Sequence, residues 1–253
     1  MVAAIIPDDT LLTMRFLMGR RTSVSADDLA ALETSVDGVQ MLSARKTIVH
    51  AYEPVKVATM LLDGFMCRYM DDRAGHRQLV AIHVPGDFVD LHGYPMHQLD
   101  HDIATIDACR VANWSHRTLD RLTAERPELT RMLWFSTLLD AAMHREWIFR
   151  MGRLDAEGRI AHLMCEMEAR LASVGLSHQG RFTLPFKQVD LAEACGLTGV
   201  HVNRTLRALR ERRLLLFRSG EAEILDRAGL RAIADFDPTY LYVNQSGSPL
   251  PKE

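Results

Sequence analysis

Six arginines and a single acid lie in the stretch from residue 198 to residue 218. The arginines are at positions 204, 207, 210, 212, 213 and 218, and Glu211 is the only acid, so the local charge is +5. A guanidinium group pairs with phosphates, and its planar fork matches O6 and N7 of guanine. Because the formal net charge of the whole chain is −3, the positive charge is a local feature. Such clustering favours a polyanionic partner.

The arginines belong to a two-helix pattern, which reads DLAEACGLTGVHVNRTLRALRERRLL over 190–215. The first helix is predicted over 187–194. Gly196 supplies the positive φ that a sharp turn between helices requires, and Thr198 can cap the second helix. Val202, Leu206 and Leu209 are predicted to face the core. The candidate DNA-binding residues on and near the outward face are Thr198, Gly199, Val200, His201, Asn203, Arg204, Arg207 and Arg210.

This pattern is typical of a helix-turn-helix, whose second helix fits the major groove of DNA. Arg204 is predicted to read guanine, and Asn203 to take an adenine edge or a phosphate. Arg207, Arg210 and Thr198 are better placed for phosphates. The alternative is a plain helical hairpin whose arginines only face solvent. The following segment LLLFRSGEAEIL predicts a hairpin with Ser-Gly at its turn, which favours the DNA-binding interpretation.

A second group with possible chemistry comprises His83, His92, His97 and His101. Histidines on a jelly roll can bind a metal or haem, which leaves open a metal- or haem-binding sensor or a cupin-like metalloenzyme. Cupin ligands need an H-x-H pair followed by a glutamate, and the group contains no H-x-H. No nucleophile–base pair or carboxylate dyad is recognisable either. We therefore predict no enzyme activity and no metal site, and the cofactor and effector stay unknown.

Three segments surround these residues. Residues 1–126 are predicted to hold a short helix over 25–34 and, between Val39 and Trp114, antiparallel strands of a jelly-roll-like β-roll. A long helix with a broad apolar face follows, in the segment 127–152. Residues 153–240 are predicted to form a winged helix-turn-helix, and 241–253 a disordered tail. The fold class is α+β.

The long helix, predicted over 127–151, carries more apolar side chains than one domain needs. Trp134, Leu139, Met143 and Trp147 are among them. We expect it to pair with the same helix of a second copy, although an ordinary buried helix would show similar periodicity.

No signal peptide or membrane span is expected, since no stretch approaches 18 uninterrupted apolar residues. The four cysteines, at 67, 109, 165 and 195, form no CxxC or zinc spacing. A reducing cytoplasm is the expected location.

From residue 25 to 237 the chain resembles the Crp/Fnr superfamily of bacterial transcription regulators. The resemblance is carried by the strand-rich run with its PGD turn at 85–87, the long helix, the segment GRLDAEGRIAHLMCEM and the 190–215 stretch. It implies a β-roll sensor domain, a dimerisation helix and a winged helix-turn-helix. It also implies a homodimer on near-palindromic double-stranded DNA, with half-sites ~34 Å apart, and RNA polymerase as a further partner.

The chain departs from well-known members at three points. Where cyclic-AMP-binding members carry a phosphate-holding arginine, this sequence has Asp100, His101 and Asp102. No cysteine precedes Cys67, whereas iron–sulfur members carry several near the N-terminus. Val200 replaces a glutamate that many members use to read a base, although their arginine is retained as Arg204. An effector other than cyclic AMP is therefore expected, with Arg68, Arg73 and Arg77 as the substitutes to consider if cyclic AMP did bind.

Overall fold

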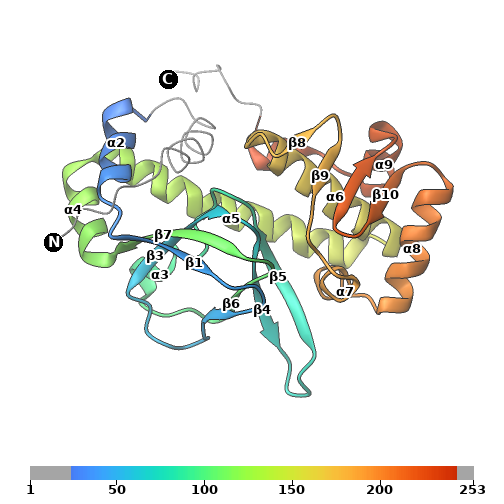
Figure 1. Ribbon diagram of the computed structural model, residues 1–253, viewed down its shortest axis with the longest axis horizontal. Helices are drawn as coiled ribbons and strands as arrows, with labels where there is room; N and C mark the ends of the chain where they lie inside the picture. Colours follow the sequence, from blue (N-terminus) through green and yellow to red (C-terminus); the bar gives the residue numbers. More distant parts are fainter. Residues whose placement is uncertain (1–23, 244–253) are drawn as a thin grey trace.

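The computed structural model describes residues 24–243, and the expectations for the first 23 and last ten residues lie outside that range. Two antiparallel sheets form the N-terminal β-roll. Figure 1 shows the β-roll and a C-terminal domain side by side, connected by one long helix. The predicted α+β architecture is confirmed.

The first sheet has the strand order β1-β7-β3, and the second has the order β2-β6-β4-β5. Their bounds are Gly38–Leu42 (β1), Thr47–Val49 (β2), Val57–Asp63 (β3), Met66–Asp71 (β4), Arg77–His83 (β5), Asp102–Thr105 (β6) and Cys109–Ser115 (β7). The five central residues of β3 are all buried, because core side chains cover both faces of this strand. Sequence alternation is therefore weak there.

Two glycine turns shape the β-roll. Gly64, at φ 87°, ends β3 and leads the chain into the other sheet. A Cβ at this position would lie 2.5 Å from the carbonyl oxygen of Ala108, so only glycine fits. Gly86, at φ 96°, forms the predicted PGD turn, in which the Val84 N–H donates to the Asp87 carboxylate at 3.0 Å.

Helices α2 (Ala26–Thr34), α3 (Gly93–Met96) and α4 (His116–Glu125) accompany the β-roll. Ser25 caps α2 by accepting from the Asp28 N–H at 3.0 Å, as its sequence predicts. The fully buried Trp114 of β7 donates its indole N–H to the carbonyl of Leu32 at 3.0 Å. This bond and the surrounding apolar packing attach α2 to the first sheet.

The long helix α5 covers Pro127–Arg153, two residues more than the prediction at its C-terminal end. Pro127 stands in its first turn, where a missing N–H costs nothing. At 1.5 Å per residue the 27 residues span about 40 Å. In Figure 1 the helix runs from α4 along the β-roll to the C-terminal domain.

The C-terminal domain places helices around a small sheet of order β10-β11-β9-β8. Its elements are α6 (Ala156–Ser173), β8 (Ser177–His178), β9 (Arg181–Thr183), α7 (Gln188–Cys195), α8 (Gly199–Glu211), β10 (Leu215–Arg218), β11 (Glu221–Ile224), α9 (Arg227–Ala234) and the 3-10 helix η1 (Pro238–Leu241). Helix α6 is the centre of this core, with Ile160, Leu163 and Met167 fully buried. None of the helices between residues 24 and 243 combines the length and hydropathy that a bilayer span needs.

The two domains are in polar contact through α7. Arg45, in the turn after β1, pairs both guanidinium nitrogens with the carboxylate of Asp190. Gln78 of β5 donates to the main-chain carbonyl of Glu193. Asp190 is buried and Arg45 is exposed, so this ion pair lies where the contact between the domains meets solvent.

Candidate DNA-binding site

Helix α7 and the turn after it are built by local side-chain chemistry. The Asp190 carboxylate accepts from the Lys187 N–H at 2.6 Å and so holds the first turn of α7. Leu191 is fully buried and Ala192 nearly so. Gly196 ends the helix at φ 59°, and Thr198 accepts from the His201 N–H at 3.3 Å to begin α8. The predicted turn glycine and cap are thus found at their positions.

One face of α8 packs into the domain. Val202 and Leu209 have no exposed surface, and Leu206 is partly buried against the same cluster. Thr205, which the sequence did not single out, is also buried. The inward face therefore contains the three predicted residues and, in addition, Thr205.

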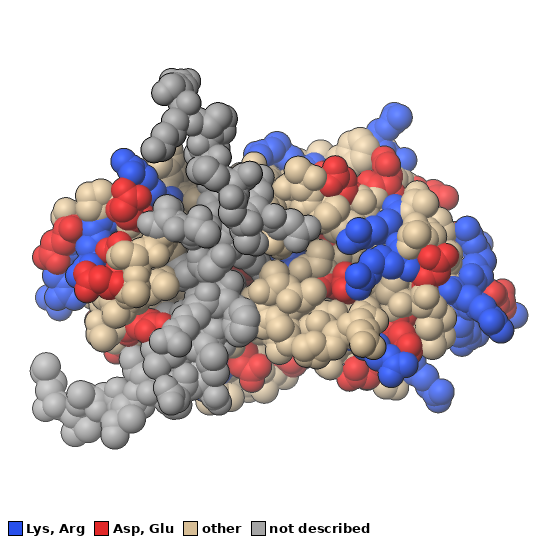
Figure 2. Space-filling view, turned by 90° about the horizontal axis from the view of Figure 1, so that it is seen from above, with Lys and Arg blue, Asp and Glu red and all other residues tan. Residues whose placement is uncertain are grey.

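The opposite face of α8 is open to solvent. All eight predicted DNA-binding residues are exposed, and Val200 retains 76% of its accessible surface. Figure 2 shows Lys and Arg side chains gathered at the end of the molecule that carries α8. The structure thus brings the predicted residues onto one accessible surface.

The arginines of this surface differ in their partners. Arg207 pairs with Glu211 one turn later at 2.7 Å, and Arg212 pairs with Glu157 of α6 at 2.7 Å. The bond from Arg207 lowers the pKa of Glu211, which stays a charged competitor for the guanidinium. Within residues 24–243, no carboxylate lies within ion-pair distance of Arg204 or Arg210. These two guanidinium groups are available to a new partner without breaking an ion pair.

Asn203 has a neighbour that the sequence did not reveal. Its Nδ2 donates to Oε1 of Gln188 at 2.7 Å, and Gln188 Nε2 donates to Asn203 Oδ1 at 2.6 Å. Gln188 is the first residue of α7 and lies 15 positions upstream. Only the crossing of α7 and α8 brings the two amides together, so no local pattern could predict the pair.

The hairpin β10–β11 forms the predicted wing. Ser219 and Gly220 make its turn, at φ 52° and 81°, the mirror-image geometry that two-residue hairpin loops favour. A groove separates the wing from α8, and its lining includes Lys187, Leu206 and Arg218. Basic side chains are exposed on all three features, with Arg204 on α8, Lys187 at the groove and Arg218 on the wing.

Comparison with known proteins supports this assignment. Residues 158–233 match the family model of the Crp-like helix-turn-helix domain, which covers α6 through most of α9. The chain is 27% identical over 169 residues to the nitrogen fixation regulation protein FixK of Azorhizobium caulinodans, covering 66% of each chain. It is 23% identical over 212 residues to the transcriptional activator FnrA of Stutzerimonas stutzeri, covering 84% of this chain and 86% of that protein. The solved structure of FixK2 from Bradyrhizobium japonicum superposes with a TM-score of 0.71, at 23% identity, over 78% of this chain and 96% of that one.

Residues 158–233 therefore match a Crp-like helix-turn-helix domain, and the chain is similar to Crp/Fnr regulators over a larger part of its length. The similarity supports a DNA-binding transcriptional regulator of the Crp/Fnr type. The family resemblance implies a sensor role for the β-roll, and the pocket of the β-roll is called the sensor pocket.

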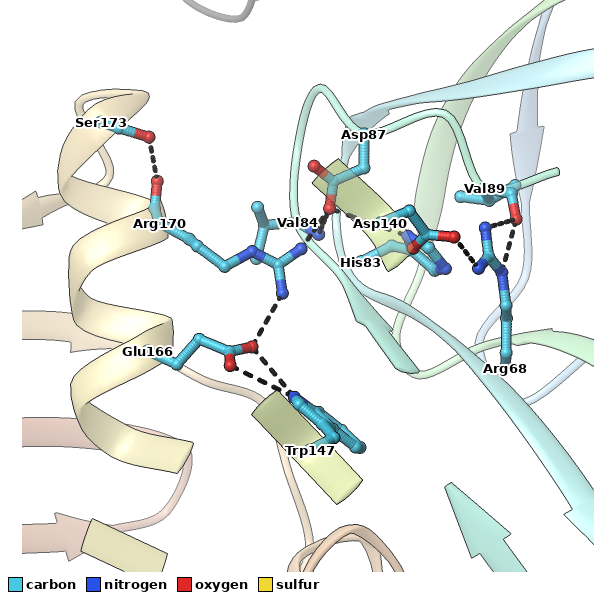
Figure 3. A network of polar contacts seen from close by, with 10 residues as sticks. All are labelled: Arg68, His83, Val84, Asp87, Val89, Asp140, Trp147, Glu166, Arg170 and Ser173. Carbon is cyan, nitrogen blue, oxygen red and sulfur yellow. Dashed lines mark hydrogen bonds and ion pairs between the residues drawn. The ribbon is translucent and has the colours of Figure 1, made fainter. Parts of the chain in front are cut away.

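The β-roll carries a pocket, open to solvent, between its strands and α5. Its lining includes Arg68 and His83 from the strands, and Ser136, Leu139 and Asp140 from α5. Arg68 is the substitute arginine that reaches the pocket, but its guanidinium is already engaged. It donates twice to the carbonyl of Val89, at 2.9 and 2.7 Å, and pairs with Asp140 (Figure 3).

The acids beside this pocket are not those that the sequence suggested. Asp100 pairs with His101 at 2.8 Å and Asp102 with His50 at 3.2 Å, and neither lines the pocket. The lining acids are Asp87 and Asp140. Asp100 precedes β6 and Asp102 begins it, and both lie outside the wall of this pocket.

The four predicted histidines separate in the structure. His83 and His92 line the pocket, and the His92 ring lies 5.2 Å from that of His101, whereas the His97 ring lies 5.8 Å from that of His116. Burial and the charge of Arg68 lower the pKa of His83 to about 4 and that of His92 to about 3. Among residues 24–243, no group of three or more His, Cys, Asp or Glu side chains is arranged to hold a metal ion.

A chain of polar contacts links the pocket to the DNA-binding domain (Figure 3). Asp87, at the pocket wall, pairs with the buried Arg170 of α6, and Arg170 also bonds Glu166 at 3.3 Å. Glu166 accepts from the indole N–H of Trp147 in α5 at 3.2 Å. Burial alone would raise the pKa of Glu166, but the charges of Arg170 and Arg150 hold that pKa below its usual value. The network therefore places the positive charge of Arg170 between the carboxylates of Asp87 and Glu166, where the β-roll meets the C-terminal domain.

Proposed function

We propose that this regulator binds a near-palindromic site on double-stranded DNA as a homodimer, with α8 of each copy in the major groove. The observation that carries the proposal is the exposed face of α8, on which Arg204 has no ion-pair partner among the described residues. The proposed setting is the cytoplasm, with RNA polymerase as a further partner, as the family resemblance implies.

The residues on the exposed face of α8 fall into two groups, those proposed to contact bases and those proposed to contact phosphates. Arg204, near the middle of the face, is the proposed guanine reader, because its planar fork fits O6 and N7. Thr198, Arg207 and Arg210 are the proposed phosphate contacts, which supply affinity without sequence choice. Gly199, Val200 and His201 form the first turn of α8, where the helix would approach the base edges most closely.

The proposed dimer rests on apolar surface left open on α5. Trp134 is 66% exposed, Leu138 54% and Ile148 72%, and they are spaced by four and ten residues along one side of the helix. Of the residues that the sequence indicated, only Trp134 belongs to this stripe. Trp147 is buried beside Glu166, and Leu139 and Met143 line the sensor pocket, because the β-roll and α6 cover those sides of α5. Apolar side chains that stay exposed along one side of a helix favour pairing with a second copy, because pairing would bury them.

The decisive experiment is a protection footprint on promoter DNA of the host, followed by binding of the unmodified protein and of Arg204→Ala to the protected site and to a scrambled site. Arg204→Ala should cost ~1–3 kcal/mol on the protected site and relax one base position per half-site. Equal losses on the two DNAs would contradict a base-reading role for Arg204. If the arginines served solubility alone, neither DNA would show a loss.

A further inference from the structure

Gln188 and Asn203 form a closed amide pair on the surface proposed to face DNA. The two hydrogen bonds, 2.6 and 2.7 Å long, run in opposite directions between the same two amide groups. Both side chains are exposed, and Asn203 directly precedes Arg204 on α8. The pair therefore joins the first turn of α7 to the proposed base-reading position.

The chemistry of amides decides what this pair leaves available. Each amide has an oxygen with two lone pairs and a nitrogen with two hydrogens. A closed two-bond pair uses the oxygen and the hydrogen on the same side of the amide. An asparagine that reads adenine bidentately uses that same edge, accepting from N6–H and donating to N7. While the pair is closed, Asn203 keeps one N–H and one lone pair, which point in different directions.

We propose that Gln188 is a specificity-determining residue, which masks the adenine-reading edge of Asn203. This inference rests on the proposed function, since it requires α8 to face the bases. Reading adenine would mean exchanging two hydrogen bonds to Gln188 for two to the base, with little net gain. Without Gln188, the same edge of the Asn203 amide would give up only hydrogen bonds to water when it binds adenine. Adenine would then be preferred over the other bases at that position.

The position of Gln188 at the start of α7 keeps its amide beside that of Asn203. The first turn of α7 is held by the bond from the Lys187 N–H to Asp190, and Asp190 is in turn held by Arg45 of the β-roll. Gln188 therefore projects from a fixed backbone toward α8. Val189, next to it and 52% exposed, has no side-chain hydrogen-bonding group that could pair with Asn203, and it serves as the matched control.

The test is selection of binding sites from a library with randomised half-sites, using the full-length chain. Gln188→Ala should raise the preference for adenine about 3- to 10-fold at one position per half-site, beside the base read by Arg204. Gln188→Ala combined with Asn203→Ala should lose that gain, and Val189→Ala should show none. In the protein that retains Gln188, Asn203→Ala should change adenine preference less than twofold.

Two results would overturn the inference while leaving the proposed function intact. One is an unmodified protein that selects a defined site through Arg204, with Gln188→Ala selecting the same bases at every position or less adenine. The other is a large loss of adenine preference on Asn203→Ala alone, because Asn203 would then read adenine with Gln188 in place. An unmodified protein that selects no site at all would instead overturn both.

Discussion

At the scale of single residues, charge pairs decide which cations can meet a new ligand. Arg68 in the sensor pocket and Arg207 on α8 are both already paired with a carboxylate, whereas Arg204 is not paired within the described chain. A pair must be broken or shared before its arginine can hold a phosphate. The availability of an arginine thus depends on its neighbours more than on its place in the sequence.

The pairing of Arg68 predicts weak binding of cyclic AMP. Its N–H groups are taken by Val89 and Asp140, and Asp87 and Asp140 would repel a phosphate in the pocket. Calorimetry should therefore detect no micromolar binding by the unmodified protein. Asp140→Asn removes one acid and releases Arg68, so it should increase the affinity for anionic nucleotides measurably. Micromolar binding by the unmodified protein would contradict this account.

The exposed pair on α8 predicts opposite effects for its two members. Arg207→Ala should weaken binding to all sequences about equally and reduce the salt dependence by roughly one ion per subunit. Glu211→Ala should strengthen binding to all sequences, because it removes both a competing carboxylate and a negative charge beside DNA. A salt series on the protected and scrambled sites measures both. A change in base preference for either variant would show that Arg207 reads bases.

At the scale of elements, α5 has three different sides. One faces the sensor pocket, one packs against the C-terminal domain through Trp147, and one exposes the stripe of Trp134, Leu138 and Ile148. The same helix therefore touches the sensor, the DNA-binding domain and the proposed second copy.

The exposed stripe predicts which substitutions separate the copies. Leu138→Asp or Ile148→Asp would bury a charge between two paired helices, so each should produce monomers with reduced affinity for the palindromic site. Leu138→Met keeps an apolar side chain of similar size and should remain dimeric. Sedimentation at micromolar concentration distinguishes the two states. A monomeric unmodified protein under those conditions would refute the proposed dimer.

At the scale of the whole molecule, buried ionisable groups make the free energy of unfolding depend on pH. Burial lowers the pKa of His83 and of His162 to about 4, from an ordinary value of 6.5. Below pH 6.5 the unfolded chain takes up protons on these rings, whereas the folded chain does not until about pH 4. Acidification through this window therefore favours unfolding. Asp90, whose pKa burial raises to about 7, acts in the opposite direction but is a single group.

The expected result is a loss of stability as the pH falls from 6.5 toward 4, by up to ~1.4 kcal/mol per pH unit for each buried histidine. His162→Gln should reduce this slope by about one histidine's share. Urea unfolding at a series of pH values measures the slope, and measurements at pH 8 give the pH-independent cost of the substitution. A free energy of unfolding that rises on acidification would contradict the assignment of buried neutral histidines.

The sequence by itself determined the local features of this protein. The glycine turn at 196, the Thr198 cap, the two faces of α8 and the Ser-Gly wing turn all depend on residues within a few positions of one another, so periodicity and φ preference suffice to predict them. The antiparallel character of the β-roll followed in the same way.

Only the tertiary structure decided which distant residues meet. The Gln188–Asn203 pair, the Arg68–Asp140 pair and the exposed side of α5 are set by how elements cross and by which neighbours cover them. Trp147 and Trp134 have the same residue type on one helix, yet one is buried and one exposed, because α6 packs on one side of α5 only. Sequence spacing along α5 carries no information about that covering, since the residues that do the covering lie elsewhere in the chain.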